Sequence, residues 1–139
     1  ILFQIQQLNL EDHVIVKKHI SIKEVKKLIQ GADLLLLPSV EEGIANVVLE
    51  SMALGTLVLS TDCGGMDEVI LNRQTGFIVP VRNPKAIADR IEEIIALPYH
   101  IKEEITSNAR QMIERQHSEG KMIKDMVTLY QQTRQNVSA

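Results

Sequence analysis

The chain has few aromatic residues, and this scarcity excludes several kinds of binding site. Aromatic side chains make up 3% of its 139 residues, and tryptophan is absent. Stacking platforms for nucleic-acid bases and aromatic sugar-binding grooves are therefore not expected. The formal net charge of −3 does not call for a nucleic acid as a partner either.

Cysteine and long apolar runs are also scarce. Cys63 is the only cysteine, which excludes an internal disulfide and fits a reducing compartment. The longest compact apolar run, residues 34–37, has the length of a strand, whereas a membrane-spanning helix needs about 20 apolar residues. The N-terminus has neither the basic start nor the cleavage site of a signal peptide. We expect a cytoplasmic protein. The four histidines are scattered and form no metal-ligand spacing with the cysteine, so no metal site is expected.

What the chain does contain is enough apolar sequence for one domain. Hydrophobic residues make up 45% of it, a usual share for a globular protein, and 139 residues suffice for a single core. The chain lacks an initiator methionine and begins within a helical pattern. We therefore expect one domain over residues 1–139 that is truncated at its N-terminus.

Strand and helix patterns alternate from residue 14 to residue 95. Strands are predicted at residues 13–16, 34–37, 56–60 and 75–80. Helices are predicted at residues 1–8, 21–31, 45–55, 66–71 and 83–95, and further helices fill residues 96–139. The strands are continuously apolar, which indicates burial on both faces. This pattern predicts an α/β protein with a Rossmann-like, mostly parallel sheet and helices on both of its faces.

Local signals mark several helix ends. Ser21 and Glu24 have the spacing of a capping box, and Asn83 precedes a proline at a favourable first-turn position. Gly31 and Gly55 are expected to end the two helices that precede them. Three isoleucines are expected to line the core face of the helix at residues 83–95, namely Ile87, Ile91 and Ile95. The methionines near the C-terminus are expected in the core or against a missing domain.

The most informative stretch is SVEEGIANVVLE, residues 39–50. It begins with a loop at the carboxyl end of a predicted strand, where parallel sheets bind their ligands. The loop leads into a helix whose first amides have no partner within the helix, and these amides together with the helix dipole favour an anion. Gly43 leaves room for a phosphate close to the backbone. The stretch therefore predicts a phosphate-binding loop.

Two acidic residues flank this helix start. Glu50 lies about one turn into the helix, roughly 6 Å along its axis, where its carboxylate can accept hydrogen bonds from a ribose. Glu42, in the loop, can contact a second polyol on the other side of a diphosphate. The alternative is that both acids simply face solvent. The apolar neighbours of Glu50 in the sequence favour the interpretation as a nucleoside-diphosphate-sugar site.

A family resemblance supports this interpretation. PSxxEGxxNVxLESMALGTLVLST, followed by DCGGMDEVI and NRQTGFIVP, closely resembles the C-terminal, donor-binding domain of the large family of retaining nucleotide-sugar glycosyltransferases of GT-B fold (glycosyl transferases of group 1, family four). Glu42 and Glu50 match its paired-glutamate motif. The resemblance covers residues 5–95, and residues 96–139 add C-terminal helices.

The resemblance implies roles for individual residues. Glu50 would bind the ribose of the donor, and Glu42 would contact the donor sugar at the reaction centre. The backbone amides of the loop and helix start would hold the diphosphate, and Ser39 lies in the matching loop. The implied diphosphate-binding residues are Gly43, Ile44, Ala45, Asn46 and Val47. The implied reaction transfers a hexosyl group to an acceptor hydroxyl with retention of configuration, in polysaccharide or glycolipid biosynthesis, without a cofactor and without an obligatory metal.

The sequence departs from the family pattern in two respects. The basic pair that neutralises the diphosphate and the first two strands would precede residue 1, as would the N-terminal domain that binds a saccharide or lipid-linked acceptor. Lys17 and Lys18 do not match the basic pair, and Lys18 stands where relatives usually have glycine, near the donor base. The resemblance therefore leaves the base open, and we expect the isolated chain to be inactive.

Several alternatives stay open at this stage. The chain can be a non-catalytic partner subunit that keeps the fold, whereas a dinucleotide-binding module is disfavoured because no G-x-G-x-x-G follows a strand. The loop at residues 62–65 is either a tight turn or a contact with donor or acceptor. Five lysines in residues 17–27 form either a solvated face or a contact with anionic lipid or phosphate, which would place the protein at the inner membrane face. Open sheet edges can also pair two copies in a dimer.

Overall fold

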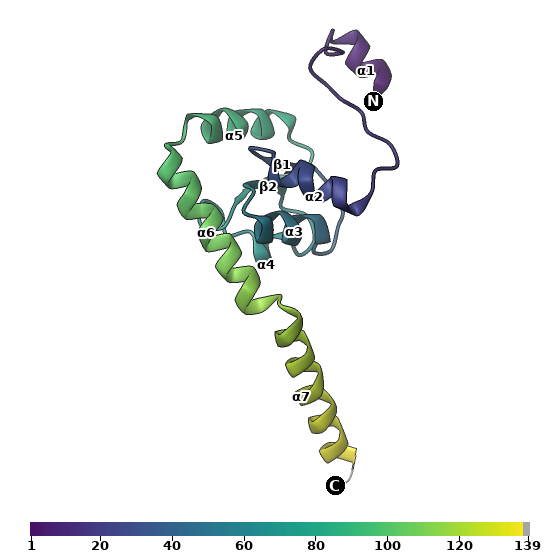
Figure 1. Ribbon diagram of the computed structural model, residues 1–139, viewed down its shortest axis with the longest axis vertical. Coiled ribbons are helices and arrows are strands. Elements are labelled where there is room, and N and C mark those ends of the chain that lie inside the picture. The colour runs from purple at the N-terminus through teal and green to yellow at the C-terminus, as the bar shows by residue number, and fades with distance from the viewer. Residues whose placement is uncertain (138–139) are drawn as a thin grey trace.

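The computed structural model describes the backbone of residues 1–137 and the side chains of residues 1–133 (Figure 1). Three short strands alternate with helices in the middle of the chain. The strands are β1 (Leu35–Leu37), β2 (Val58–Thr61) and β3 (Phe77–Val79). The helices are α1 (Leu2–Gln7), α2 (Ile22–Gln30), α3 (Asn46–Leu54), α4 (Met66–Val69), α5 (Pro84–Ala96), α6 (Tyr99–Gln116) and α7 (Glu119–Val137). The predicted alternation of strands and helices is therefore confirmed between α2 and α5.

The strands form one parallel sheet in the order β1-β2-β3. Leu36 pairs with Leu59, and Ser60 pairs with Ile78. All four residues of the central strand β2 are buried. Because parallel strands end at the same edge of a sheet, the loops after β1, β2 and β3 meet at one edge.

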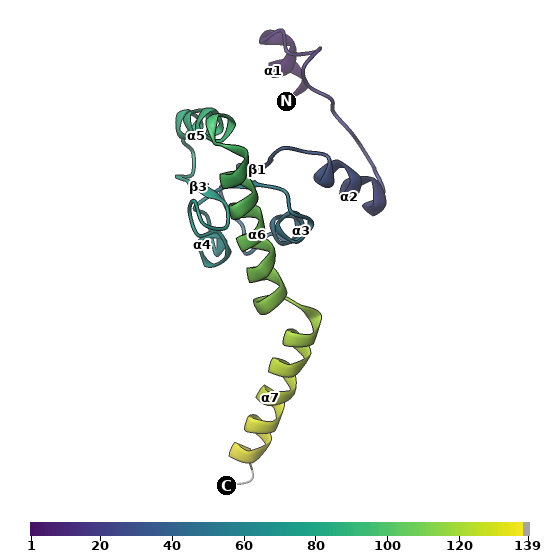
Figure 2. The ribbon, with the colours of Figure 1, turned by 60° about the vertical axis from the view of Figure 1, so that its left-hand side comes forward.

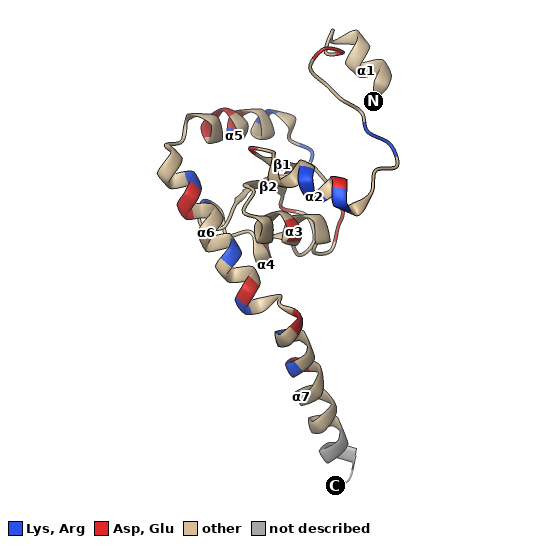
Figure 3. Cartoon of the chain, viewed as in Figure 1, with Lys and Arg blue, Asp and Glu red and all other residues tan. Residues whose placement is uncertain are grey.

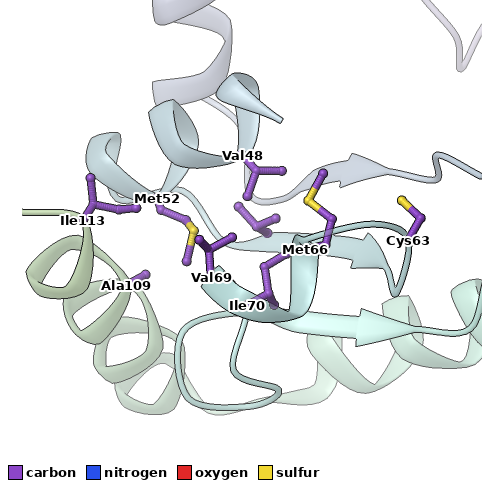
Figure 4. Close-up of a cluster of buried hydrophobic side chains, with 9 residues drawn as sticks. Val48, Met52, Cys63, Met66, Val69, Ile70, Ala109 and Ile113 are labelled. Atoms are coloured by element: carbon purple, nitrogen blue, oxygen red, sulfur yellow. The ribbon is translucent and has the colours of Figure 1, made fainter. Parts of the chain in front are cut away.

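Helices cover both faces of the sheet, as predicted. On one face, Val58 of β2 lies in a cluster with Val48 and Met52 of α3, residues of α4, and Ala109 of α6 (Figure 4). On the other face, β2 and β3 pack against α5 and the first part of α6. That second cluster contains Leu57, Leu59, Phe77, Val79, Ile94 and Ile105. Val58 and its neighbours Leu57 and Leu59 thus point into two separate cores, which explains the apolar run at residues 57–59.

The predicted helix ends are confirmed. Ser21 accepts a hydrogen bond from the Glu24 amide, and the Glu24 carboxylate accepts one from the Ser21 amide, so the capping box is complete. Asn83 accepts from the Ala86 amide at 3.0 Å and caps α5. Gly55 ends α3 in the left-handed conformation, with φ of +84°.

The strand predicted at residues 13–16 is wrong. This segment has no strand pairing, and Ile15 is 83% exposed. Figure 2 shows the segment between α1 and α2 passing outside the sheet. A β-strand exists only where a neighbouring strand completes its hydrogen bonds, and apolar sequence alone cannot supply that neighbour.

Two burial predictions are also wrong. Leu36, expected to be buried on both faces of the sheet, is 39% exposed because β1 is an edge strand. Ile95, expected on the core face of α5, is 70% exposed, whereas Ile94 is buried. Ile94 continues the spacing of Ile87 and Ile91 around the helix, and Ile95 lies about 100° further round.

The C-terminal helices differ in how they pack. Helix α6 contributes Ile105, Ala109 and Ile113 to the cores, and Arg110 Nε of the same helix donates to the Ala53 carbonyl at 2.9 Å. Helix α7 extends away from the sheet in both views (Figures 1 and 2). Met122 and Met126 of α7 are 61% and 47% exposed, so the prediction that they pack in the core is wrong. No described helix combines the length and the apolar composition needed to cross a membrane.

Candidate functional site

Two hydrogen bonds tie together the loops that follow the strands. The Thr61 hydroxyl, at the end of β2, donates to the backbone carbonyl of Ser39, in the loop after β1. The Val81 amide, in the loop after β3, donates to Asp62 Oδ1 at 2.9 Å. The three loops therefore form one connected surface at the carboxyl edge of the sheet, the edge at which parallel sheets bind ligands.

Gly64 brings the first two loops into direct contact. Its φ is +56°, a left-handed conformation that side chains other than glycine rarely adopt. A Cβ atom at this position would lie 1.6 Å from the Glu42 carbonyl oxygen and 2.8 Å from the Glu42 carbonyl carbon. A Cβ on the adjacent Gly65 would lie 3.1 Å from the Ile44 side chain. The backbone of residues 42–43 thus lies directly against Gly64, and the Ile44 side chain lies against Gly65.

The start of α3 leaves backbone amides available to a ligand. Its N-cap residue, Ala45, has no side chain that can accept a hydrogen bond. The amides of Val48 and Leu49 both donate to the Ala45 carbonyl. Within the described residues, the amides of Asn46 and Val47 donate to no protein acceptor. Such unpaired amides at the positive end of a helix dipole favour an anion.

The residues predicted for the diphosphate lie along this loop and helix start. Gly43 is exposed, and a Cβ built on it would meet nothing within 4 Å, so the space above its backbone is open. Asn46 is exposed as well. Ile44 and Ala45 are half-buried and pack against the core, which leaves their backbone as the part that a ligand can contact. Val47 is half-buried, and its carbonyl accepts a hydrogen bond from the Ser51 hydroxyl.

The two predicted acids lie on either side of this helix start in the chain, and both are accessible. Glu42 is exposed in the loop, and Glu50 is exposed on α3. The opposite side of α3 is buried through Val48, Ser51 and Met52. Neither carboxylate forms a hydrogen bond or an ion pair with a described residue, so both remain available to a ligand. Ser39 is half-buried, and its carbonyl is the acceptor for Thr61.

The structure also bears on the remaining candidate residues. Asp62 supports the loop after β3 through its bond with Val81. Cys63 is buried, and its Sγ lies 3.5 Å from Thr61 Oγ1 at the end of the core cluster (Figure 4). The lysines of α2 lie on exposed positions of that helix (Figure 3). Among the described residues, no group of three or more His, Cys, Asp or Glu side chains is placed to hold a metal ion.

Sequence reasoning missed the roles of Thr61 and Gly64. Both lie at or just after the end of a predicted strand, and Gly64 belongs to a glycine pair, which is a signal for a tight turn or a close backbone approach. The sequence did not show which segment approaches Gly64, because Glu42 lies 22 residues earlier in the chain.

Comparison with known sequences identifies the family. The family model for glycosyl transferases group 1 matches residues 2–112, and the chain belongs to this family. It is similar to an uncharacterised glycosyltransferase of Methanocaldococcus jannaschii, with 31% identity over 89% of this chain and 32% of the relative. It is also similar to the capsular polysaccharide biosynthesis glycosyltransferase CapM of Staphylococcus aureus, with 30% identity over 85% of this chain and 30% of the relative. The chain thus spans about a third of the length of these relatives.

Solved structures agree on the fold. The chain superposes on sucrose-phosphate synthase from Thermosynechococcus elongatus with a TM-score of 0.88 and 26% identity, over 97% of this chain and 34% of the other. Anabaena HepE, solved in complex with UDP-glucose, gives a TM-score of 0.78 and 24% identity over 99% of this chain and 35% of the other. These matches confirm that the fold is that of the C-terminal domain of GT-B glycosyltransferases.

Proposed function

We propose that this chain is the donor-binding part of a retaining glycosyltransferase, which transfers a hexosyl group from a nucleoside diphosphate to an acceptor hydroxyl. The observation behind the proposal is the start of α3, where the first backbone amides have no protein acceptor. Glu42 lies before this helix start and Glu50 lies within the helix. Amides at a helix start favour a diphosphate, and carboxylates accept hydrogen bonds from the hydroxyls that flank it. Membership of the glycosyl transferases group 1 family supports the reaction class.

Each group has one task in this proposal. The amides of residues 43–47 hold the diphosphate and stabilise the charge that develops on it as the bond to the sugar breaks. Glu50 accepts hydrogen bonds from the ribose, and Glu42 contacts the donor sugar at the reaction centre. Because the charge is stabilised by fixed amides, the reaction does not need an obligatory metal.

The proposal extends to the biological setting. CapM, one of the similar proteins, is named for capsular polysaccharide biosynthesis, and we place this protein in polysaccharide or glycolipid biosynthesis as well. Its acceptor is then a saccharide or a lipid-linked saccharide. The protein would act in the cytoplasm, where nucleotide sugars are supplied, with any contact to the inner membrane face being peripheral.

The test is a calorimetric titration of the chain with UDP, GDP and ADP, repeated on Glu50→Ala. We expect one nucleotide to bind and Glu50→Ala to weaken it by about 1–3 kcal/mol, the usual effect of losing a hydrogen bond to a charged group. Glu104→Ala is the matched control, because Glu104 is an exposed acid on α6 and its loss should leave the affinity unchanged. UDP is the first choice because HepE was solved with a uridine nucleotide sugar.

Two results would contradict the proposal. A folded chain that binds none of the three nucleotides has no donor site. Equal affinity of the unsubstituted chain and of Glu50→Ala would remove Glu50 from the site.

A further inference from the structure

We propose that Gly64 and Thr61 are positioning residues for Glu42. They hold the backbone of the loop at residues 39–44, here called the Glu42 loop, and thereby determine where the Glu42 carboxylate and the neighbouring backbone amides lie. This inference deepens the proposed function and rests on it for its consequence in donor binding. The placement of the loop itself depends only on contacts within the chain.

The first support is steric. Glu42 is exposed and its carboxylate has no protein partner among the described residues, so its side chain does not hold it in place. In contrast, a Cβ atom on Gly64 would lie only 1.6 Å from the backbone carbonyl oxygen of Glu42. Real Cβ contacts are ordinarily 3.4 Å or more, and the clashing atom belongs to a backbone. The two loops can therefore approach this closely only while position 64 is glycine.

The second support is the hydrogen bond from Thr61. Its side chain is buried, and its hydroxyl donates to the carbonyl of Ser39, at the beginning of the same loop. Thr61 is itself held by pairing with Val79 in the sheet. The Glu42 loop is therefore attached to the rigid strand β2 at Ser39 and rests on Gly64 at Glu42.

The position of the Glu42 loop matters for donor binding because the groups that bind a ligand must be placed accurately. A misplacement of about 1 Å can cost about 100-fold in activity, and a Cβ at position 64 requires one of two backbones to move. Since residues 43–47 follow Glu42 directly, such a shift also moves amides that would hold the diphosphate.

The decisive experiment measures the loop directly. Limited digestion of the folded chain with a glutamate-specific protease reports cleavage at the bond between Glu42 and Gly43, and cleavage after Glu119 in α7 serves as the internal reference. Proteolysis of a native protein follows the population of locally open states, so we expect Gly64→Ala to speed the Glu42 cleavage at least about five-fold relative to the reference.

A glycine variant of similar strain provides the control. Gly55→Ala introduces a Cβ at a left-handed position, with φ of +84°, but at the far end of α3, where it meets only the side chain of Arg110. We expect Gly55→Ala to lower the melting temperature without changing the relative cleavage after Glu42. A general loss of stability would instead affect both glycine variants alike.

Thr61 provides an independent pair of variants if Gly64→Ala does not fold. Thr61→Val has nearly the same shape but no hydroxyl, and Thr61→Ser keeps the hydroxyl. We expect cleavage after Glu42 to be faster in Thr61→Val than in the unsubstituted chain. In Thr61→Ser we expect the rate of the unsubstituted chain. Cleavage rates equal to that of the unsubstituted chain in Gly64→Ala and in Thr61→Val would overturn the positioning proposal.

A titration of the same variants with UDP links the loop to the donor. We expect Gly64→Ala and Thr61→Val to bind UDP at least ten-fold more weakly, whereas Gly55→Ala and Thr61→Ser keep the affinity. An unchanged affinity in variants with a loosened loop would overturn the link between loop and donor. Failure of the unsubstituted chain to bind any nucleotide would overturn the proposed function instead, since the cleavage rates are measured without a ligand.

Discussion

The buried hydroxyl of Thr56 donates a hydrogen bond of 2.7 Å to the backbone carbonyl of Ile29, 27 residues earlier in the chain. Ile29 lies in the last turn of α2 and is the buried residue of that helix. Its carbonyl also accepts a hydrogen bond from the Ala32 amide at 3.1 Å. Thr56 lies two residues before the first residue of β2, Val58. The bond therefore fastens α2 to the sheet at the point where the helix ends.

We expect Thr56→Val to lower the free energy of unfolding by about 1 kcal/mol, because it removes one buried hydrogen bond and keeps the side-chain shape. Thr56→Ser retains the hydroxyl and serves as the control. Urea unfolding followed by circular dichroism measures both. Equal midpoints for Thr56→Val and the unsubstituted chain would show that the bond contributes nothing.

Met52 and Met122 should respond very differently to the same substitution. Met52 of α3 is fully buried between the sheet and α6, whereas Met122 of α7 is 61% exposed. Truncating a buried methionine to alanine removes apolar contacts and leaves a cavity, which costs about 2–5 kcal/mol. We expect a loss of this size for Met52→Ala and almost none for Met122→Ala in thermal or urea unfolding. A comparable loss in the two variants would contradict the packing of α3 against α6.

The capping box of α2 gives a prediction for pH. The hydrogen bonds from Ser21 to the Glu24 carboxylate lower the pKa of Glu24 below its ordinary value. A lowered pKa in the folded state means that the capping contribution is present above the unfolded pKa and is lost as the pH falls through the folded pKa. We expect a carboxyl-detected NMR titration to show the lowered pKa of Glu24.

Ser21→Ala should raise the pKa of Glu24 toward its ordinary value, because it removes the hydroxyl donor and the acceptor for the Glu24 amide. The backbone amide of residue 21 also lowers this pKa and is still present in Ser21→Ala, so the shift should not vanish entirely. If Glu24 titrates identically in the two proteins, the capping box does not form in solution.

Features set by neighbouring residues could be predicted from the sequence. The capping box at Ser21, the cap at Asn83 and the glycine at the end of α3 are confirmed because each depends on a few adjacent backbone groups. The alternation of apolar strands and amphipathic helices likewise predicted the parallel sheet with two covered faces, since burial leaves a periodic pattern in the chain.

The candidate site was predicted in part for the same reason. The loop before α3 and the two acids around the helix start are close together in the sequence, and the structure finds the helix start where it was expected, at Ala45 and Asn46. Their assignment to a sugar donor came from the family resemblance, and their roles stay predictions that the nucleotide titration tests.

Tertiary structure alone decided the features that depend on distant partners. Residues 13–16 have the composition of a strand but no neighbour to pair with, and Leu36 is partly exposed because β1 forms an edge. The choice of Ile94 over Ile95 follows from how α5 rests on the sheet. The contact of Gly64 with the Glu42 carbonyl is also of this kind. The sequence by itself determined the local elements and the residues of the loop, because hydrogen bonds and periodicity within a few residues specify them. Only the packed sheet determined how that loop is held, because the contacts that hold it join residues about 20 positions apart.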